Sequence, residues 1–310
     1  MIHLAFGTPR KLPRARDLQG RVVVLDIAFA YDTASEGGRF EKITNRFITT
    51  LGPRLAAWVD HHDHEKHAEF AGDDRFVLAT KAQHPACPEM ITPELVARIA
   101  AKGPVDTIVC HTDFDGLCSA AKWMREGREP YPGADADARA IDSRIGQPSP
   151  VGERFDRALR GRPHDEGLFG LVVRHLATGL ADASLWNVVD AAAQDYRAQE
   201  DEARRLARAF VRLRGSPHGV AFVDASPPSD GGARRPYDKT LLLLLGQERE
   251  KIAVVLDRDN ISLAAAFDSG VDFLRLLGLS GGMPTRVSVP RSRAPEVWIA
   301  LGVKDPPALR

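Results

Sequence analysis

Four of the chain's ten histidines lie within seven positions: His61, His62, His64 and His67. They follow a short apolar run that ends at Asp60. Imidazole nitrogens and carboxylate oxygens bind divalent metals, and imidazoles also transfer protons near neutral pH. Chance explains so dense a group poorly, and a packed core histidine does not explain an adjacent pair. We therefore take His61 and His62 as candidate site residues, and we interpret His64 and His67 as part of a solvated polar run.

A second candidate segment, His111-Thr-Asp-Phe-Asp-Gly116, follows an apolar run at residues 105–110. Alternate residues of an extended segment point to the same side, so His111, Asp113 and Asp115 could converge on one point. Carboxylates mixed with imidazoles suit Mn²⁺ and related divalent ions. Gly116 allows a close backbone turn into a helix, whose N-terminus attracts anions. The plain alternative is an acidic turn that caps this helix, for which Asp115 alone would suffice.

Short apolar runs alternate with helical patterns through the first half of the chain. Strands are predicted at residues 22–25, 56–59, 76–79 and 105–110, and helices at 38–51, 93–102 and 116–126. This alternation predicts an α/β fold with a parallel sheet. Ligands bind such sheets at the carboxyl ends of the strands. Three of the four runs end in a residue that could do chemistry: Asp26, Asp60 or His111.

The second half of the chain predicts a smaller α/β domain. A long helical pattern covers residues 183–214, with acids before arginines, as the helix dipole favours. Strand runs follow at 219–223, 252–256 and 261–266, with helices near 239–245 and 271–277. We expect a first domain at residues 1–182, a connecting helix at 183–215 and a second domain at 216–310.

Composition limits the classes of function. The 310 residues include 42 Lys+Arg and 42 Asp+Glu, and the formal net charge is zero. Long duplex DNA is therefore not an expected partner, because proteins that bind it by bulk phosphate neutralisation carry a basic excess. The three cysteines form no CxxC pair, which fits a reducing cytoplasm. We find no export signal and no apolar run near the roughly 20 residues of a spanning helix, so we expect a cytoplasmic protein without a membrane segment.

These motifs resemble a known family. Asp60-His61-His62 is similar to the motif that names the DHH phosphoesterases, and the segment from His111 to Gly116, continued by Leu-Cys-Ser119-Ala, is similar to their aspartate-rich motif. The resemblance implies a parallel-sheet catalytic domain that binds two divalent metal ions, Mn²⁺ in the first place with Mg²⁺ or Co²⁺ as alternatives. It also implies a smaller C-terminal substrate domain, called DHHA1.

The order of the motifs differs from that of the family, in which the aspartate-rich motif precedes DHH. The chain therefore looks like a circular permutation, which preserves a site because ligands converge in space whatever their order. The family's isolated aspartate then corresponds to Asp26. Its last aspartate corresponds to Asp142, with Asp190 as the other candidate.

The resemblance implies a role for each candidate residue. His111 and Asp113 would bind one metal, His61, Asp115 and Asp142 the other, and Asp26 would bridge the two. Asp60 would orient His61, and His62 would contact the phosphate. Substrate-binding residues in the C-terminal domain would be found in its glycine-rich turn, at Gly281, Gly282 and Arg286. For Arg286, a surface arginine near a turn is the plain alternative, and the turn lacks the histidine usual in nuclease members.

The implied activity is hydrolysis of a phosphate ester of a nucleotide, a short single-stranded oligonucleotide or another small phosphorylated substrate, by two-metal activation of water. Two other functions stay open. One is a mononuclear zinc hydrolase that uses the cluster from His61 to His67, with His84 and Cys87 nearby. The other is a catalytically degenerate member that senses a nucleotide without cleaving it. Whether cleavage is endo or exo, and whether the chain forms a homodimer, does not follow from the sequence.

Overall fold

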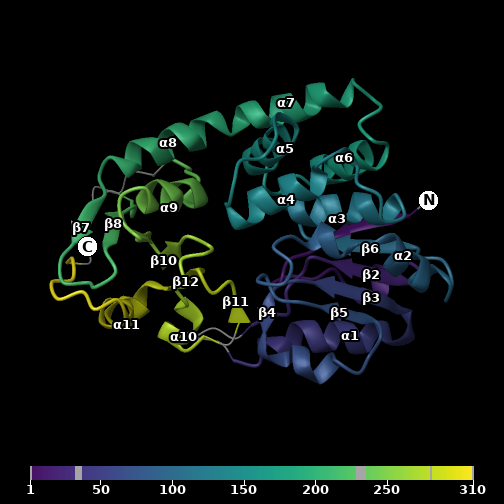
Figure 1. Ribbon diagram of the computed structural model, residues 1–310, viewed down its shortest axis with the longest axis horizontal. Helices are drawn as coiled ribbons and strands as arrows, with labels where there is room; N and C mark the ends of the chain where they lie inside the picture. Colours follow the sequence, from purple (N-terminus) through teal and green to yellow (C-terminus); the bar gives the residue numbers. More distant parts are fainter. Residues whose placement is uncertain (1, 32–36, 228–234, 280, 309–310) are drawn as a thin grey trace. The chain divides into compact units, whose positions relative to one another are not determined.

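The computed structural model describes residues 2–31, 37–227, 235–279 and 281–308 (Figure 1). The chain divides into two compact units, one formed by Met1–Asp32 and Gly38–Tyr196 and the other chiefly by Arg197–Arg310. Residues 228–234 of the expected second domain lie outside the described residues. No helix within the described ranges is both long enough and apolar enough to cross a membrane.

The first unit is built on a parallel sheet of five strands in the order β1-β6-β2-β3-β5. The strands are β1 (His3–Phe6), β2 (Val22–Leu25), β3 (Leu55–Asp60), β5 (Phe76–Leu78) and β6 (Thr107–Cys110), and a two-residue strand β4 (Asp63–His64) follows β3. The four predicted strands are confirmed. The edge strand β1 was not predicted, because its short, partly exposed sequence gives little apolar signal.

Helices cover both faces of this sheet (Figure 1). They are α1 (Arg46–Leu51), α2 (Pro93–Ala100), α3 (Phe114–Met124), α4 (Ala134–Ser143), α5 (Pro150–Gly161), α6 (Glu166–Ala177) and α7 (Leu185–Asp195), and a π-helical segment, Phe40–Asn45, leads into α1. Alternate strand residues face opposite cores: Val23 packs with α2 and α3, whereas Val22 and Val24 pack with α1. The predicted α/β fold is confirmed.

The strand order brings three chain segments to one edge of the sheet. Strand β2 leads to β3 and β5 on one side, and the chain then returns to place β6 on the other side of β2. The residues that follow β6, β2 and β3 are His111, Asp26 and His61. Because these three strands are parallel neighbours, the three residues emerge side by side at the point where the strand order reverses, which is where such sheets bind ligands.

The prediction of a single long helix over residues 183–214 is wrong. The structure has α7, then α8 (Arg197–Ala207), and then a strand, β7 (Val211–Leu213). Strand β7 pairs antiparallel with β8 (Val220–Asp224), and Leu213 is buried. Pairing with a neighbouring strand therefore overrides the helical pattern in these residues. Helices α4, α5 and α6 were not predicted.

The second unit is a smaller mixed α/β unit, as expected. Its sheet has the order β12-β10-β9-β8-β7, with β8 and β9 parallel and the other pairs antiparallel. The remaining elements are β9 (Ile252–Leu256), β10 (Asn260–Ala265), β11 (Gly281–Gly282), β12 (Arg286–Pro290), α9 (Lys239–Gln247), α10 (Phe273–Leu277) and α11 (Ala294–Ala300). Helices α8 and α9 pack on one face of this sheet and α10 and α11 on the other.

The loop after β2 is held by the π-helical segment. The Oγ of buried Thr44 accepts a hydrogen bond from the backbone N–H of Ala30 at 2.8 Å. We predict that Thr44→Val lowers the free energy of unfolding by roughly 1–3 kcal/mol, because it leaves a buried N–H without an acceptor. The matched variant Thr49→Val, at an exposed position of α1, should change it by less than about 0.5 kcal/mol. Urea unfolding measures both values, and equal midpoints would contradict this role of Thr44.

Candidate metal centre

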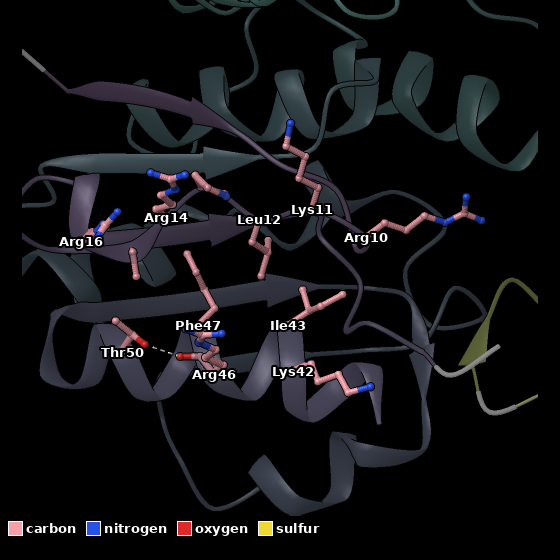
Figure 2. Close-up of a pocket in the computed structure, with 12 residues that line it drawn as sticks. Arg10, Lys11, Leu12, Arg14, Arg16, Lys42, Ile43, Arg46, Phe47 and Thr50 are labelled. Carbon is pink, nitrogen blue, oxygen red and sulfur yellow. Dashed lines mark hydrogen bonds between the residues drawn. The ribbon is translucent and has the colours of Figure 1, made fainter. Parts of the chain in front are cut away.

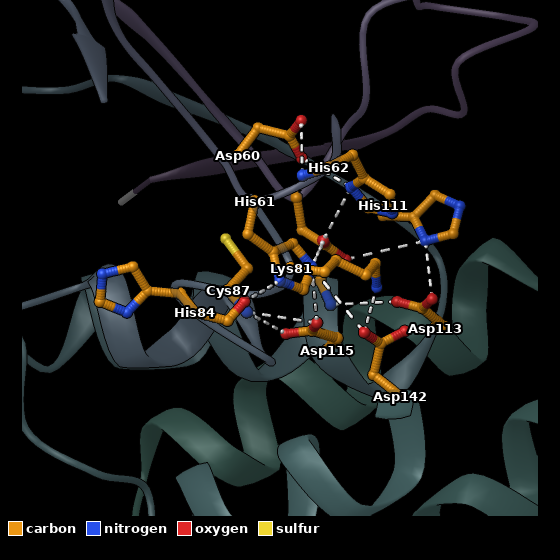
Figure 3. A network of polar contacts seen from close by, with 12 residues as sticks. Asp60, His61, His62, Lys81, His84, Cys87, His111, Asp113, Asp115 and Asp142 are labelled. Carbon is orange, nitrogen blue, oxygen red and sulfur yellow. Dashed lines mark hydrogen bonds and ion pairs between the residues drawn. The ribbon is translucent and has the colours of Figure 1, made fainter. Parts of the chain in front are cut away.

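Six side chains of ligand type meet at the carboxyl edge of the first unit's sheet. They come from the ends of β2, β3 and β6, the start of α3 and the last turn of α4: Asp26, His61, His111, Asp113, Asp115 and Asp142. Figure 3 shows this network from close by. All six are residues that the sequence singled out as metal ligands.

The six residues form two groups, and a third group, Asp26, His61 and His62, adds a seventh side chain that could hold an ion. In the first, His111 Nδ1 lies 2.9 Å from Asp113 Oδ2 and 3.8 Å from Asp26 Oδ2. In the second, His61 Nε2 lies 3.2 Å from Asp115 Oδ2 and 3.9 Å from Asp142 Oδ2. The donor atoms of each group lie within 4.8 Å of one another, close enough to surround a single ion.

Asp26 lies between the two groups. Its Oδ2 faces His111, and its Oδ1 lies 3.2 Å from His61 Nε2. The residue is buried and has a φ of 58°, in the left-handed region that aspartate tolerates better than most residues with a side chain. This conformation costs roughly 1–2 kcal/mol and is an outlier of the kind that clusters at functional sites.

Three buried donor atoms of the cluster, Asp26 Oδ1, His61 Nε2 and His111 Nδ1, make no well-aligned hydrogen bond within the described residues, although each lies 2.9–3.2 Å from an atom of opposite charge. Buried polar atoms without a well-aligned hydrogen bond are rare, and each needs an explanation. All three are atoms that could coordinate a cation, and they belong to a mixture of carboxylates and imidazoles that suits Mn²⁺ and related ions. The residues therefore fit divalent metal ions.

Backbone groups orient several of the candidate ligands. The Nδ1 of His61 lies 2.7 Å from the carbonyl oxygen of His84, so it carries the proton and leaves Nε2 free to coordinate. The N–H of Cys87 donates to both carboxylate oxygens of Asp115, at 3.0 and 3.2 Å. Sequence reasoning missed both backbone partners, because a backbone group carries no residue-specific signal.

Asp60 does not orient His61, contrary to expectation. Its Oδ1 instead accepts from Nδ1 of His62 at 2.8 Å, and its Oδ2 accepts from the backbone N–H of His62 at 3.3 Å (Figure 3). Successive side chains after a strand diverge, so the buried carboxylate reaches the second histidine and not the first. The pair fixes the ring of His62, which is partly exposed.

Asp113 and Asp115 do not share an extended segment, because α3 begins at Phe114. Asp113 is the N-cap, and its Oδ1 accepts from the N–H of Gly116 at 3.1 Å. The expectation that Asp115 could serve as the cap is therefore wrong. The helical turn between the two aspartates sends Asp113 to the group of His111 and Asp115 to the group of His61.

Asp142 belongs to the cluster, whereas Asp190 on α7 forms a two-point ion pair with Arg154. A buried lysine that the sequence did not reveal, Lys81, contacts Asp142 through Nζ (Figure 3). Burial lowers the pKa of Lys81, but the carboxylates of Asp142, Asp115 and Asp26 outweigh this effect and raise it, so the ammonium is charged.

The other histidines of the run are not solvated. His64 and His67 are half-buried and pack edge-on against the ring of Phe29. None of the candidate metal groups within the described residues includes them, nor do these groups include His84 or Cys87. Of the residues named for a zinc site, only His61 and His62 belong to a candidate metal group within the described residues, together with Asp26.

The glycine-rich stretch belongs to the second unit. Gly281 and Gly282 form the short strand β11, and a backbone hydrogen bond from Arg286 to Met283 closes a turn before β12. The guanidinium of Arg286 donates to Oγ of Thr240 at 2.6 Å.

Burial and the close packing of charged side chains shift the pKa values of the cluster. Burial and the carboxylates of Asp115 and Asp113 raise the pKa of Asp26 well above its usual value. Burial and Lys81 lower the pKa of His61, but the carboxylates of Asp115 and Asp26 outweigh them and raise it to about 11. Burial likewise lowers the pKa of His111, but Asp113 outweighs it and raises the value to about 9. Without metal, both histidines therefore hold protons at neutral pH.

Comparison with known proteins adds little to this geometry. No protein family model matches the chain, and no curated protein matches it. One similar solved structure is the pGpG-specific phosphodiesterase PggH from Vibrio cholerae, with 11% sequence identity and a TM-score of 0.42 over 79% of this chain and 77% of that chain. At this TM-score and identity, the likeness supports no conclusion about activity.

A close approach at Gly116 provides a test of the first group. A Cβ at this position would lie 2.6 Å from the carbonyl oxygen of His111 and 2.7 Å from its Cβ. We predict that Gly116→Ala displaces His111 and weakens Mn²⁺ binding at least about tenfold. Gly72→Ala is the control, because a Cβ there meets nothing within 4 Å. Calorimetric titration with Mn²⁺ measures the effect, circular dichroism checks folding, and an unchanged affinity in a folded variant would refute the prediction.

Metal binding should also depend on pH. Because His61 and His111 are protonated without metal, a bound ion must displace their protons, and affinity should rise about tenfold per pH unit for each proton released, between about pH 6 and about pH 8. Calorimetry in buffers of different ionisation enthalpy counts the protons. An affinity that does not change with pH would show that neither imidazole is a ligand.

Proposed function

We propose that this chain is a metal-dependent phosphoesterase that hydrolyses a phosphate ester of a nucleotide, a short oligonucleotide or another small phosphorylated substrate. One observation carries the proposal. The two oxygens of the Asp26 carboxylate face different histidines, His61 and His111, and each histidine belongs to its own group of carboxylate ligands. A carboxylate shared in this way suits a pair of neighbouring divalent ions.

The proposed ligands follow from the two groups. Asp113 and His111 would hold one ion, His61, Asp115 and Asp142 the other, and Asp26 would contact both. Mn²⁺ fits this mixture of carboxylates and imidazoles best, with Mg²⁺ or Co²⁺ as alternatives. When bound, the two ions supply Lewis-acid activation of the phosphate ester and of the attacking water.

His62 is the proposed phosphate contact. Its Nδ1 is engaged by Asp60, which leaves Nε2 on a partly exposed ring beside Asp26. Burial and the neighbouring Lys81 lower the pKa of His62 despite the opposing effect of Asp60, so the ring is neutral in the metal-free centre. A phosphate dianion beside the ring would favour its charged form, which can donate a hydrogen bond to the phosphate.

Charge couples the proposed substrate to the metals. Asp26, Asp113, Asp115 and Asp142 gather four carboxylates at one edge, against the single permanent positive charge of Lys81. Protons on His61 and His111 balance most of the remaining negative charge in the metal-free centre, whereas two divalent ions would make the centre positive, so substrate affinity should depend on metal occupancy.

The resemblance to DHH phosphoesterases adds a proposal for the whole chain. We assign the catalytic part to residues 1–182, the connection to 183–215 and a substrate-binding part to 216–310. In this last part, the turn with Gly281, Gly282 and Arg286 would contact the substrate. The circular permutation remains part of this proposal, and it is supported by the proximity of Asp26 to Asp113 despite their inverted order in the chain.

The deciding experiment is hydrolysis by the purified chain with Mn²⁺, using bis-p-nitrophenyl phosphate, a short single-stranded oligonucleotide and pyrophosphate. We predict that Asp26→Asn and Asp142→Asn lower turnover by more than about a hundredfold. Asparagine suits position 26 because it tolerates the left-handed conformation. Asp190→Asn is the matched control and should keep its activity, because Asp190 pairs with Arg154 away from the cluster.

His62→Asn separates the two proposed kinds of residue. It should lower kcat/KM and leave the stoichiometry of bound Mn²⁺ unchanged, whereas Asp26→Asn should lower both. Loss of bound metal in His62→Asn would make His62 a ligand and not a phosphate contact. Nucleotide binding without hydrolysis of any substrate would contradict the hydrolase and favour a sensor.

A further inference from the structure

A basic pocket opens on the α1 face of the first unit's sheet (Figure 2). It has a volume of about 630 Å³ and is formed by two segments, residues 10–16 and residues 42–50. Pockets that bind small molecules have volumes of roughly 300–1,000 Å³. The pocket therefore has the size of a nucleotide site.

The charge of the pocket lining is entirely positive. Six of the described lining residues are cationic and none is acidic: Arg10, Lys11, Arg14, Arg16, Lys42 and Arg46. Four of these side chains, on Arg10, Lys11, Arg14 and Arg46, make no ion pair or hydrogen bond within the part of the chain that the structure describes. In a chain with no net charge, this local excess of positive charge creates a site for an anion.

The floor of the pocket is apolar. Phe47 and Ala15 belong to the core between α1 and the sheet, and Leu12 packs against that core. Figure 2 shows Leu12, Phe47 and Ile43 between the two walls, with Arg14 and Arg16 on one wall and Arg46 and Lys42 on the other. A ligand that fits both surfaces has anionic groups for the rim and a flat apolar part for the floor.

The walls are held in place before any ligand binds. The guanidinium of Arg54 donates to the carbonyl oxygens of Ala15, Leu18 and Gly20, the first at 3.3 Å and the last at 2.9 Å. Thr8 and Lys11 exchange two backbone hydrogen bonds of 3.0 Å. The other wall contains the π-helical segment, a rare conformation that is frequent at functional sites. Pre-organisation of this kind lowers the entropic cost of binding.

The pocket is separate from the candidate metal centre. None of its lining residues belongs to a metal group, and Asp115 and Asp142 lie on α3 and α4, which pack on the other face of the sheet. Ligand binding here therefore requires no metal and does not depend on the proposed hydrolase function.

We propose that this basic pocket binds a nucleotide-like ligand that carries two or more phosphate groups and a flat apolar base. The phosphates contact the arginines of the rim, which present several N–H donors suited to phosphate oxygens. The base packs on Leu12 and Ile43, the partly exposed apolar side chains of the floor. A long nucleic acid fits less well, because the small apolar floor suits a single base with its phosphates.

The test uses ATP and inorganic triphosphate with the full chain in EDTA, where metal-dependent binding at the other centre is abolished. We predict that ATP binds, that the double variant Arg14→Gln, Arg46→Gln weakens its binding at least about tenfold, and that Arg128→Gln leaves it unchanged. Arg128 is the matched control because it is an exposed arginine of the same unit outside the pocket. Added salt should weaken binding to the wild-type chain.

The outcomes separate the alternatives. ATP should bind more tightly than triphosphate, and Ile43→Ser should remove this difference. No binding of ATP in EDTA, or equal affinity of the wild type and the double variant, would overturn the proposal. Equal affinities for ATP and triphosphate would overturn the role of the base. Binding of a single-stranded oligonucleotide that requires Arg14 and Arg46, without binding of ATP, would assign the pocket to nucleic acid instead.

Discussion

The position of Asp26 between His61 and His111 determines how the rest of the candidate metal centre is arranged. Its strand, β2, lies between the two strands that deliver His61 and His111, and each oxygen of its carboxylate faces one of these histidines. The residue is buried and its backbone is left-handed. The strand order thus determines which histidines can be neighbours, and the unusual backbone angle accompanies a carboxylate placed between them.

Such a concentration of acids would destabilise the fold without compensation. Within the described residues, the structure compensates it with one permanent positive charge, on Lys81, and with protons on His61 and His111. The protons can be exchanged for metal, whereas the ammonium cannot. The centre therefore combines a fixed neutralising charge at Asp142 with an exchangeable one around Asp26.

The sequence predicted much of this arrangement because a parallel sheet converts strand ends into neighbours. Asp26, His61 and His111 could be found as polar residues at the ends of apolar runs. Lys81 follows the third run, at residues 76–79, and the same signal could have found it, but lysine is not a metal ligand.

Other features depend on side-chain rotation and backbone geometry that the sequence does not reveal. The partner of Asp60 is one example, since the choice between His61 and His62 depends on the direction of each ring after the strand. The separation of Asp113 from Asp115 is another, because it requires α3 to begin at Phe114. Strand β7 formed where the residues favour a helix, because β8 was available to pair with it.

The left-handed backbone at Asp26 limits which residues can replace it at low cost. Glycine and asparagine are the residues that accept this conformation most readily besides aspartate, and neither carries a charge. A chain that lost the shared carboxylate would therefore keep this backbone at the least cost with asparagine or glycine at the end of the same strand, although Glu126, Arg144 and Leu180 adopt the same conformation elsewhere in the chain.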